Sequence, residues 1–262
     1  MKKFVILLLT LVTSFAFAQE TVYAHFYFGT VDSQKVKKHI ENELSTFKKI
    51  HEYRMKKGEI LAWDMWQMVN SGTANAKQTT FLYVTLFNDF DDFEKWEILW
   101  DERVSEIEKH EKNKEFRSVV QSVFDDYTSI SEYMVSSKGH FGTQHNSQPS
   151  KFMVLNYMSV EEFRERDYED LEINTFLPMH QRDGVRTGWE LYKVLNNYLG
   201  TDQVINYITA DYFNRFGDIM ESRDAPLPQE QVSTVKEITE LRELTISDIF
   251  KNISSLRPSD LN

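Results

Sequence analysis

The chain has 262 residues and a formal net charge of −11 at pH 7, with 30 Lys and Arg against 41 Asp and Glu. An acidic surface repels phosphate backbones, so this charge argues against nucleic-acid binding. The sequence contains no cysteine, which excludes disulfide bonds, thiolate metal sites and a cysteine nucleophile. Hydrophobic residues make up 41% of the chain and include 19 Phe and 12 Tyr, enough for a substantial core.

Residues 1–18 have the features of a secretory signal peptide. Lys2 and Lys3 form a basic start, an apolar run follows, and Ala16-Phe17-Ala18 is a small-x-small cleavage site. No later segment approaches the roughly 18 apolar residues of a membrane-spanning helix. Unless the signal is retained as an anchor, we expect an exported protein, periplasmic or secreted, with no stable membrane span and a mature chain that begins at Gln19.

The next part of the chain reads as strand, helix, strand, strand, helix. Alternation of apolar and polar side chains predicts strands, and apolar residues every three or four positions predict helices. Gly58 is expected to end the first helix. The expected elements are a strand at 21–29, a helix at 32–58, strands at 59–69 and 78–87, a helix from 88, a helical stretch at 114–135 and a polar connector at 136–150.

The second half is expected to repeat this order. It should contain a strand at 151–160, a helix at 160–182, strands at 186–196 and 203–212, a helix at 213–221, an irregular segment at 222–228 and a C-terminal helix at 229–256. Pro178 falls where the first half has Lys49, and a proline inside a helix removes a backbone hydrogen bond. We therefore expect the helix before His180 to be bent or shortened.

The order is repeated because the sequence itself is repeated. Residues 43–51 (ELSTFKKIH) reappear as 172–180 (EINTFLPMH), and 63–69 (WDMWQMV) as 189–195 (WELYKVL). Such self-similarity predicts a duplicated structural unit. We divide the chain into a signal peptide (1–18), a first repeat with an extra helix (19–135), a linker (136–150), a second repeat (151–221), and a linker with the C-terminal helix (222–262).

The duplicated unit resembles the ferredoxin-like repeat of the dimeric α/β-barrel superfamily. The resemblance lies in Phe47-x-x-Ile50-His51 and Phe176-x-x-Met179-His180, the glycines Gly58 and Gly188, and the strands at 61–66 and 188–192. The helix–Gly–Trp pattern is most similar to exported members and to the NIPSNAP-like branch. The resemblance implies an α+β fold in which two βαββα repeats pair their antiparallel sheets into an α/β barrel. The additional C-terminal helix is expected to dock on the body or on a second copy in a homodimer.

Two pairs of repeated polar residues are the candidate catalytic groups. Positions four apart lie on one side of a helix, so Glu43 and His51 share a row with Phe47, and Glu172 and His180 share the matching row. In the functional interpretation each His is a general base that the Glu orients. In the structural one, which we favour, the Phe packs in the core, the His bonds helix-terminal carbonyls and the Glu is solvated or paired with Lys.

Four aromatic residues are the candidate pocket walls. Trp63 and Trp189 face the opposite side of their strands from Asp64/Trp66 and Glu190/Tyr192, and we expect them beneath the helices, as core or as a pocket lining. Tyr83 and Tyr207, which read as matching strand positions, would add phenol groups to that pocket.

No metal site is predicted, since His140 and His145 lie in a polar connector without acidic neighbours. No cofactor is predicted either. Haem is considered only because the superfamily includes haem proteins, with His180 as ligand and Arg182 and Arg186 reaching its propionates.

The superfamily also includes cofactor-free monooxygenases, isomerases and members without known activity, and fold alone does not choose among them. We expect a barrel pocket for a small apolar or aromatic ligand. The alternative is a cofactor-independent oxygenase or isomerase that uses a helix-end His as base.

Overall fold

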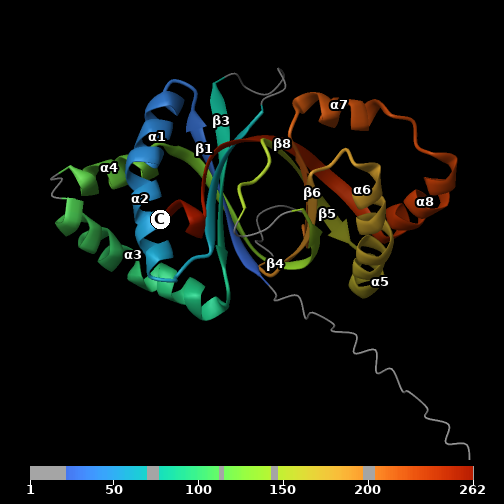
Figure 1. The fold of residues 1–262 in the computed structure, drawn as a ribbon, viewed down its shortest axis with the longest axis horizontal. Helices are drawn as coiled ribbons and strands as arrows, with labels where there is room; N and C mark the ends of the chain where they lie inside the picture. The colour runs from blue at the N-terminus through green and yellow to red at the C-terminus, as the bar shows by residue number, and fades with distance from the viewer. Residues whose placement is uncertain (1–21, 70–76, 112–114, 143–146, 197–203, 262) are drawn as a thin grey trace, which may run out of the picture.

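The computed structural model describes residues 22–69, 77–111, 115–142, 147–196 and 204–261. Eight antiparallel strands in these residues form one closed barrel in the order β1-β3-β2-β8-β5-β7-β6-β4. The predicted α+β barrel is therefore confirmed. The helices of the first half lie on one side of the barrel and those of the second half on the other (Figure 1).

Each half of the chain is a complete βαββαβ unit. The first contains β1 (Tyr23–Asp32), α1 (Val36–Asn42), α2 (Lys48–Lys56), β2 (Ala62–Met68), β3 (Gln78–Phe87), α3 (Phe90–Glu111), α4 (Phe116–Phe124) and β4 (Tyr127–Phe141). The second contains β5 (Phe152–Val160), α5 (Glu165–Leu171), α6 (Leu177–Asp183), β6 (Gly188–Val194), β7 (Tyr207–Phe213), α7 (Phe216–Asp224), α8 (Val232–Leu241) and β8 (Arg242–Leu256). Antiparallel pairing of β2 with β8 and of β4 with β6 joins the two units.

The fourth strand of each unit corrects the prediction from sequence. The helical stretch expected at 114–135 ends at Phe124, and β4 then runs through the first part of the expected connector. The C-terminal helix is present as α8, but it ends at Leu241, where β8 begins. Register shifts interrupt the pairing of both strands with their neighbours. Each bulge moves the following side chains to the other face, so apolar residues recur at helix-like spacing.

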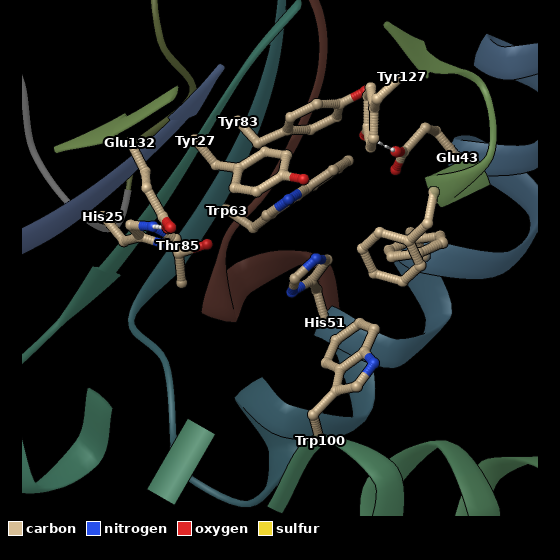
Figure 2. A pocket seen from close by; sticks show the side chains of 12 residues that line it. His25, Tyr27, Glu43, His51, Trp63, Tyr83, Thr85, Trp100, Tyr127 and Glu132 are labelled. Carbon is tan, nitrogen blue, oxygen red and sulfur yellow. Dashed lines mark hydrogen bonds and ion pairs between the residues drawn. The ribbon is translucent and has the colours of Figure 1, made fainter. Parts of the chain in front are cut away.

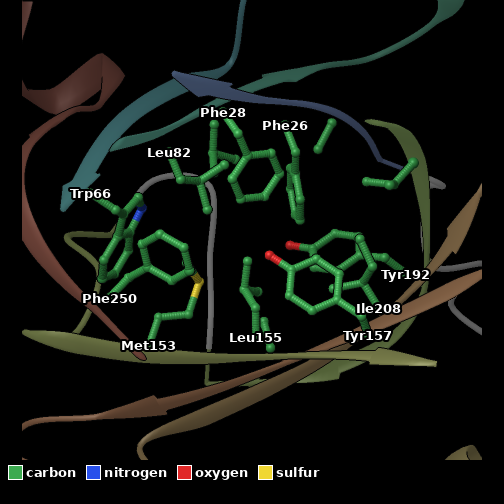
Figure 3. Packing of buried hydrophobic residues seen from close by; sticks show 14 of the residues in the cluster. Phe26, Phe28, Trp66, Leu82, Met153, Leu155, Tyr157, Tyr192, Ile208 and Phe250 are labelled. Atoms are coloured by element: carbon green, nitrogen blue, oxygen red, sulfur yellow. The ribbon is translucent and has the colours of Figure 1, made fainter. Parts of the chain in front are cut away.

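The barrel interior is packed with side chains. Phe26, Phe28, Trp66, Tyr192 and Phe250 point inward in Figure 3 and are at least nine-tenths buried. An eight-stranded barrel has an interior just wide enough for side chains to fill. Trp63 and Trp189 point outward and pack beneath the helices, as their alternation with Trp66 and Tyr192 predicts.

Both repeats interrupt their first helix in the same way. A π-helical turn spans Glu43–Phe47 in one and Glu172–Phe176 in the other. Pro178 follows the second of these turns directly, at the start of α6. The shortened helix expected there is seen, since α6 has 7 residues and α2 has 9. The interruption does not require proline, however, because the first repeat contains it with Lys49 at this position.

Several further observations concern the ends of elements. Gly58 has a φ of 74° after α2, as its predicted role at the helix end requires. The expected signal peptide and Gln19 lie outside the described residues. None of the helices in the described ranges has the length and apolar character needed to cross a membrane.

A buried ion pair ties the end of β8 to β2. Arg257 donates to both carboxylate oxygens of Asp64 at 2.8 and 3.0 Å, and the side chains are 4% and 9% exposed. The guanidinium also donates to the carbonyl oxygens of Ser147 and Leu256. Removing one member leaves the other charge buried without its partner.

We expect Arg257→Met to lower the free energy of unfolding by about 3 to 5 kcal/mol, because the Asp64 carboxylate loses its cation. Chemical denaturation measures this loss. The double variant Asp64→Leu/Arg257→Met should recover most of it. A double variant no more stable than Arg257→Met would contradict the explanation.

Candidate functional site

A cavity of about 320 Å³ lies outside the barrel, between the sheet of the first repeat and its helices. In Figure 2, Glu43 and Tyr127 lie at one end, His25, Thr85 and Glu132 at the other. Trp63, Tyr27 and His51 lie between them. The described lining residues are His25, Tyr27, Glu43, Phe47, His51, Trp63, Tyr83, Thr85, Trp100, Phe124, Tyr127 and Glu132.

The helix row predicted from sequence lines this cavity. Glu43, Phe47 and His51 all contribute to the wall. The π-helical turn places them there with an altered backbone, since the Lys48 N–H donates to the Glu43 carbonyl five residues back. Such turns are rare and occur frequently at functional sites.

Glu43 is a buried carboxyl group beside tyrosine hydroxyls, which corrects the favoured expectation that it is solvated or paired with Lys. Its side chain is 2% exposed, and the Tyr127 hydroxyl donates to its Oε1 at 3.2 Å. Burial raises the pKa of Glu43 from 4.5 to about 8, against the opposing effect of hydrogen bonds from Tyr83 and Tyr127. The group is therefore mainly protonated at neutral pH and can donate a hydrogen bond to an oxygen in the cavity.

His51 stacks on Trp63, with ring centroids 5.0 Å apart and an interplanar angle of 18°. It is 5% exposed, and its buried Nδ1 has no hydrogen-bond partner among the described residues. Burial, and then the charge of Arg54, hold the pKa of His51 well below its ordinary value. A neutral imidazole with one unsatisfied nitrogen therefore lies at the cavity wall.

The sequence did not point to several residues in and behind the cavity wall. His25 Nε2 lies 2.6 Å from Glu132 Oε2 in the wall, and behind the wall His39 Nε2 lies 2.7 Å from the Tyr83 hydroxyl. His25 and Tyr27 alternate along β1, so the face of that strand was a usable signal. Tyr127 and Glu132 were hidden because their strand was read as a helix.

Tyr127 reaches Glu43 because Gly29 leaves space for its ring. A Cβ built on Gly29 would lie 2.2 Å from Cε1 of Tyr127, closer than any such contact allows. Met158 occupies the corresponding position of the second repeat. Strand pairing shows this, because Gly29 in β1 lies opposite Phe81 and Met158 in β5 lies opposite Tyr207, the equivalent of Phe81. The two repeats therefore differ at the place where the Tyr127 ring lies.

The second repeat keeps the acidic and imidazole groups in a different environment. Glu172 is buried, which raises its pKa from 4.5 to about 7. His180 lies 5.8 Å from the Trp189 ring, and burial followed by the charge of Arg186 lowers its pKa from 6.5 to about 4. Asp211 pairs with Arg186 and accepts a hydrogen bond from Asn156.

Tyr83 and Tyr207 are not equivalent, contrary to the expectation from sequence. Tyr83 lies opposite Met65, two residues after Trp63. The matching position opposite Leu191 is Thr209, and Tyr207 lies opposite Lys193. Tyr207 instead donates a 2.6 Å hydrogen bond to Glu169 and packs with Met158, Phe176 and Trp189.

The residues around His180 do not fit a haem group. Arg186, the expected propionate ligand, forms ion pairs with Asp183 and Asp211, and Arg182 donates to the Pro178 carbonyl. The first-repeat cavity presents Glu43 and Glu132, and none of its described lining residues is a Lys or Arg that could meet propionates. No three His, Asp or Glu side chains in the described ranges are grouped so as to hold a metal ion.

Solved structures with the same architecture allow a comparison. A candidate monooxygenase from Fusobacterium nucleatum has a TM-score of 0.58 and 8% identity, over 92% of this chain and 96% of its own. One from Lactobacillus acidophilus has a TM-score of 0.59 and 9% identity, over 91% and 97%. An anthrone oxidase-like protein has a TM-score of 0.56 and 12% identity, over 91% and 94%.

The chain has the dimeric α/β-barrel fold. No protein-family model and no curated protein sequence matches it. At these identities the likeness concerns the fold alone, and the chemistry has to be argued from the cavity.

We expect Glu43→Gln to change how stability depends on pH. A carboxyl group whose pKa rises on folding makes the folded state take up a proton, so it lowers stability as pH rises from about 4.5 to about 8. The stability of Glu43→Gln relative to the unmodified protein should therefore increase across that window. Denaturation at several pH values measures this. A difference independent of pH would show that Glu43 is ionised throughout.

Proposed function

We propose that the cavity of the first repeat binds a small planar aromatic molecule that carries a hydroxyl or carbonyl oxygen. The observation that supports this most directly is the combination of aromatic walls with convergent polar groups at one end. Trp63, Tyr27 and the His51 ring offer flat surfaces, while Glu43 and Tyr127 offer hydrogen bonds. Ligand sites are commonly apolar cavities of this kind with a few placed polar groups.

The charge of the cavity favours a neutral ligand. Glu43 and Glu132 contribute carboxyl groups, and no Lys or Arg belongs to the described lining. The hydrogen bond from His25 holds the pKa of Glu132 below its usual value, so that group is ionised at neutral pH. A ligand carboxylate or phosphate would meet repulsion without a compensating cation.

One ligand per chain is the expected stoichiometry. In the second repeat, Met158, Phe176 and Trp189 pack in one buried cluster, with Ile173 and Leu177 against it. The polar groups nearby are engaged with each other, as the Arg186–Asp211 pair shows.

Proton abstraction is a second candidate function, and the unsatisfied Nδ1 of buried His51 favours it. His51 would take a proton from the ligand, and protonated Glu43 would hydrogen-bond the ligand oxygen that becomes negative. Because the pKa of His51 is low, the imidazole is a weak base, and only an acidic C–H or O–H is a suitable substrate. This is the first step expected of a cofactor-independent oxygenase or isomerase. The fold shared with candidate monooxygenases is compatible with it.

The setting of this activity is also a proposal. The basic start, apolar run and small-x-small site at 1–18 support export to the periplasm or the medium. The helix–Gly–Trp pattern supports a relation to the NIPSNAP-like branch. A homodimer stays a prediction that light scattering of the purified protein would test.

Isothermal titration calorimetry with three naphthalene compounds tests the ligand class. We expect 2-naphthol to bind at one site per chain, at least about tenfold more tightly than naphthalene or 2-naphthoate. Tyr127→Phe should weaken the binding of 2-naphthol, because Glu43 loses a hydrogen-bond partner. The matched variant Tyr168→Phe in the second repeat should not. Equal affinity for 2-naphthol and 2-naphthoate would contradict the proposal.

Deuterium incorporation into 2-tetralone in D2O, followed by mass spectrometry, tests the base. The ketone oxygen of 2-tetralone can accept hydrogen bonds at the end of the cavity where Glu43 and Tyr127 lie, and the C–H next to the ketone is acidic. We expect the protein to accelerate exchange and His51→Asn to reduce that acceleration at least about 100-fold. His180→Asn, the control in the second repeat, should leave it unchanged. If His51→Asn retains full exchange, His51 is not the base.

A further inference from the structure

His39 is a fully buried histidine that neither the predicted helix row nor the cavity lining includes. It is 0% exposed and lies in α1, behind the polar end of the cavity. Its Nε2 is 2.7 Å from the Tyr83 hydroxyl, and its Nδ1 is 3.5 Å from Asp126 Oδ2. The groups that face it from the surrounding elements are Tyr83, Glu43, Asp126, Lys35, and the rings of Phe81 and Tyr127.

Asp126 connects this histidine to the surface. The Asp126 side chain is 13% exposed, and its Oδ1 lies 3.0 Å from the ammonium group of Lys35, which is 52% exposed. Tyr83, at the inner end, lines the cavity beside Glu43 and Tyr127. The side chains of Tyr83, His39 and Asp126 therefore lie in sequence from the cavity wall to solvent. A hydrogen bond joins Tyr83 to His39, whereas the 3.5 Å contact between His39 Nδ1 and Asp126 is an ion-pair distance that must shorten before a proton can pass.

The contacts give the series a direction. Burial lowers the pKa of His39, and the opposing effect of Asp126 is smaller, so the imidazole is neutral at neutral pH. A neutral imidazole donates from one nitrogen and accepts at the other. With the carboxylate beside Nδ1, the proton lies on Nδ1, and Nε2 accepts a hydrogen bond from the Tyr83 hydroxyl. Tyr83 has a single proton, and Glu43 also lies beside its hydroxyl, so the relay uses the arrangement in which this proton points to His39 and the Tyr83 lone pairs face protonated Glu43 or a donor in the cavity.

We propose that Asp126, His39 and Tyr83 form a proton relay through which the hydroxyl proton of a bound phenol or enol leaves the cavity. This inference rests on the proposed function and adds that the ligand is a weak oxygen acid. Asp126 and His39 are positioning and transfer groups, and Tyr83 is the group that meets the ligand.

The transfer involves only O–H and N–H bonds. The ligand O–H breaks, and its proton forms a new O–H bond on Tyr83 as the former Tyr83 proton moves to His39 Nε2. The Nδ1 proton passes to Asp126 and then to water. The electron pair of the broken bond stays on the ligand oxygen, so nothing is oxidised or reduced. Protonated Glu43 can donate a hydrogen bond to the resulting anion.

The second repeat lacks every member of the relay. His39 lies four residues before Glu43, and the residue four before Glu172 is Tyr168. Thr209 takes the place of Tyr83, because it lies opposite Leu191 as Tyr83 lies opposite Met65. Arg242 lies opposite Val160 as Tyr127 lies opposite Val31, so Leu241 replaces Asp126. The relay residues therefore occur only in the repeat that has the described cavity, as a role in that cavity requires.

Stopped-flow absorbance of bound 4-nitrophenol tests the relay, because this phenol is acidic enough to ionise near neutral pH. A jump from about pH 5.5 to about pH 7.5, which stays below the pKa of about 8 of Glu43, ionises the probe, and the nitrophenolate absorbance reports the rate. In the unmodified protein we expect ionisation to be faster than dissociation of the probe, measured separately by displacement. His39→Gln and Asp126→Asn should each slow it at least about tenfold, to the dissociation rate, with dissociation constants at about pH 5.5 within about twofold of the unmodified protein.

The controls separate the relay from a structural role and from the proposed function. Asp126→Asn changes a partly exposed group, so it tests the relay even if His39→Gln fails to fold. Tyr168→Phe should leave the rate unchanged. Unchanged rates in both relay variants, or a bound probe that does not ionise in the unmodified protein, would overturn the relay alone. Absence of 2-naphthol binding would overturn the proposed function and the relay with it.

Discussion

Pairing between the two repeats is the constraint on which the rest of this structure depends. Neither four-stranded sheet has both edges covered within its own repeat, and the β2–β8 and β4–β6 pairs cover them. Closing the sheet brings the inward side chains of all eight strands together, and aromatic residues fill that space. The cavity of the first repeat lies outside this packed interior, where helices span the sheet and their side chains leave space between helix and strand.

Duplication under this constraint produces two outer layers with different uses. Both contain the π-helical turn, a buried carboxyl group with a raised pKa and a histidine beside an outward tryptophan. In the second repeat, the Arg186–Asp211 ion pair and a buried cluster that includes Met158, Tyr168 and Tyr207 surround these groups, so they contribute to packing. In the first repeat, the corresponding groups line a cavity. The conserved layout is a property of the fold, and the chemistry depends on what surrounds it.

The sequence predicted those parts of the fold that have a regular period. The repeat, the row of Glu43, Phe47 and His51, and the outward direction of Trp63 follow from spacing, whereas the barrel was expected from the resemblance to the dimeric α/β-barrel superfamily. The fourth strands could not be predicted in this way, since their bulges break the alternation that marks a strand. Tyr127, Glu132 and Asp126 were missed for that reason. Tyr207 was mismatched with Tyr83 because the two were paired by residue type, whereas the spacing from the tryptophans, which is the same in both repeats, places Thr209 at the position of Tyr83.

Gly29 shows how a position without a side chain can decide which repeat has a site. The Tyr127 ring occupies the volume that a Cβ on Gly29 would need, whereas the second repeat has Met158 at that register. Any larger residue at position 29 forces Tyr127 away from Glu43 and leaves the acid without that hydroxyl. Among chains of this fold, the residue at this register position should therefore distinguish an open repeat from a packed one better than the histidines do. The difference between Gly29 and Met158 at this one position therefore separates the two repeats as clearly as the differences between their acidic and basic groups.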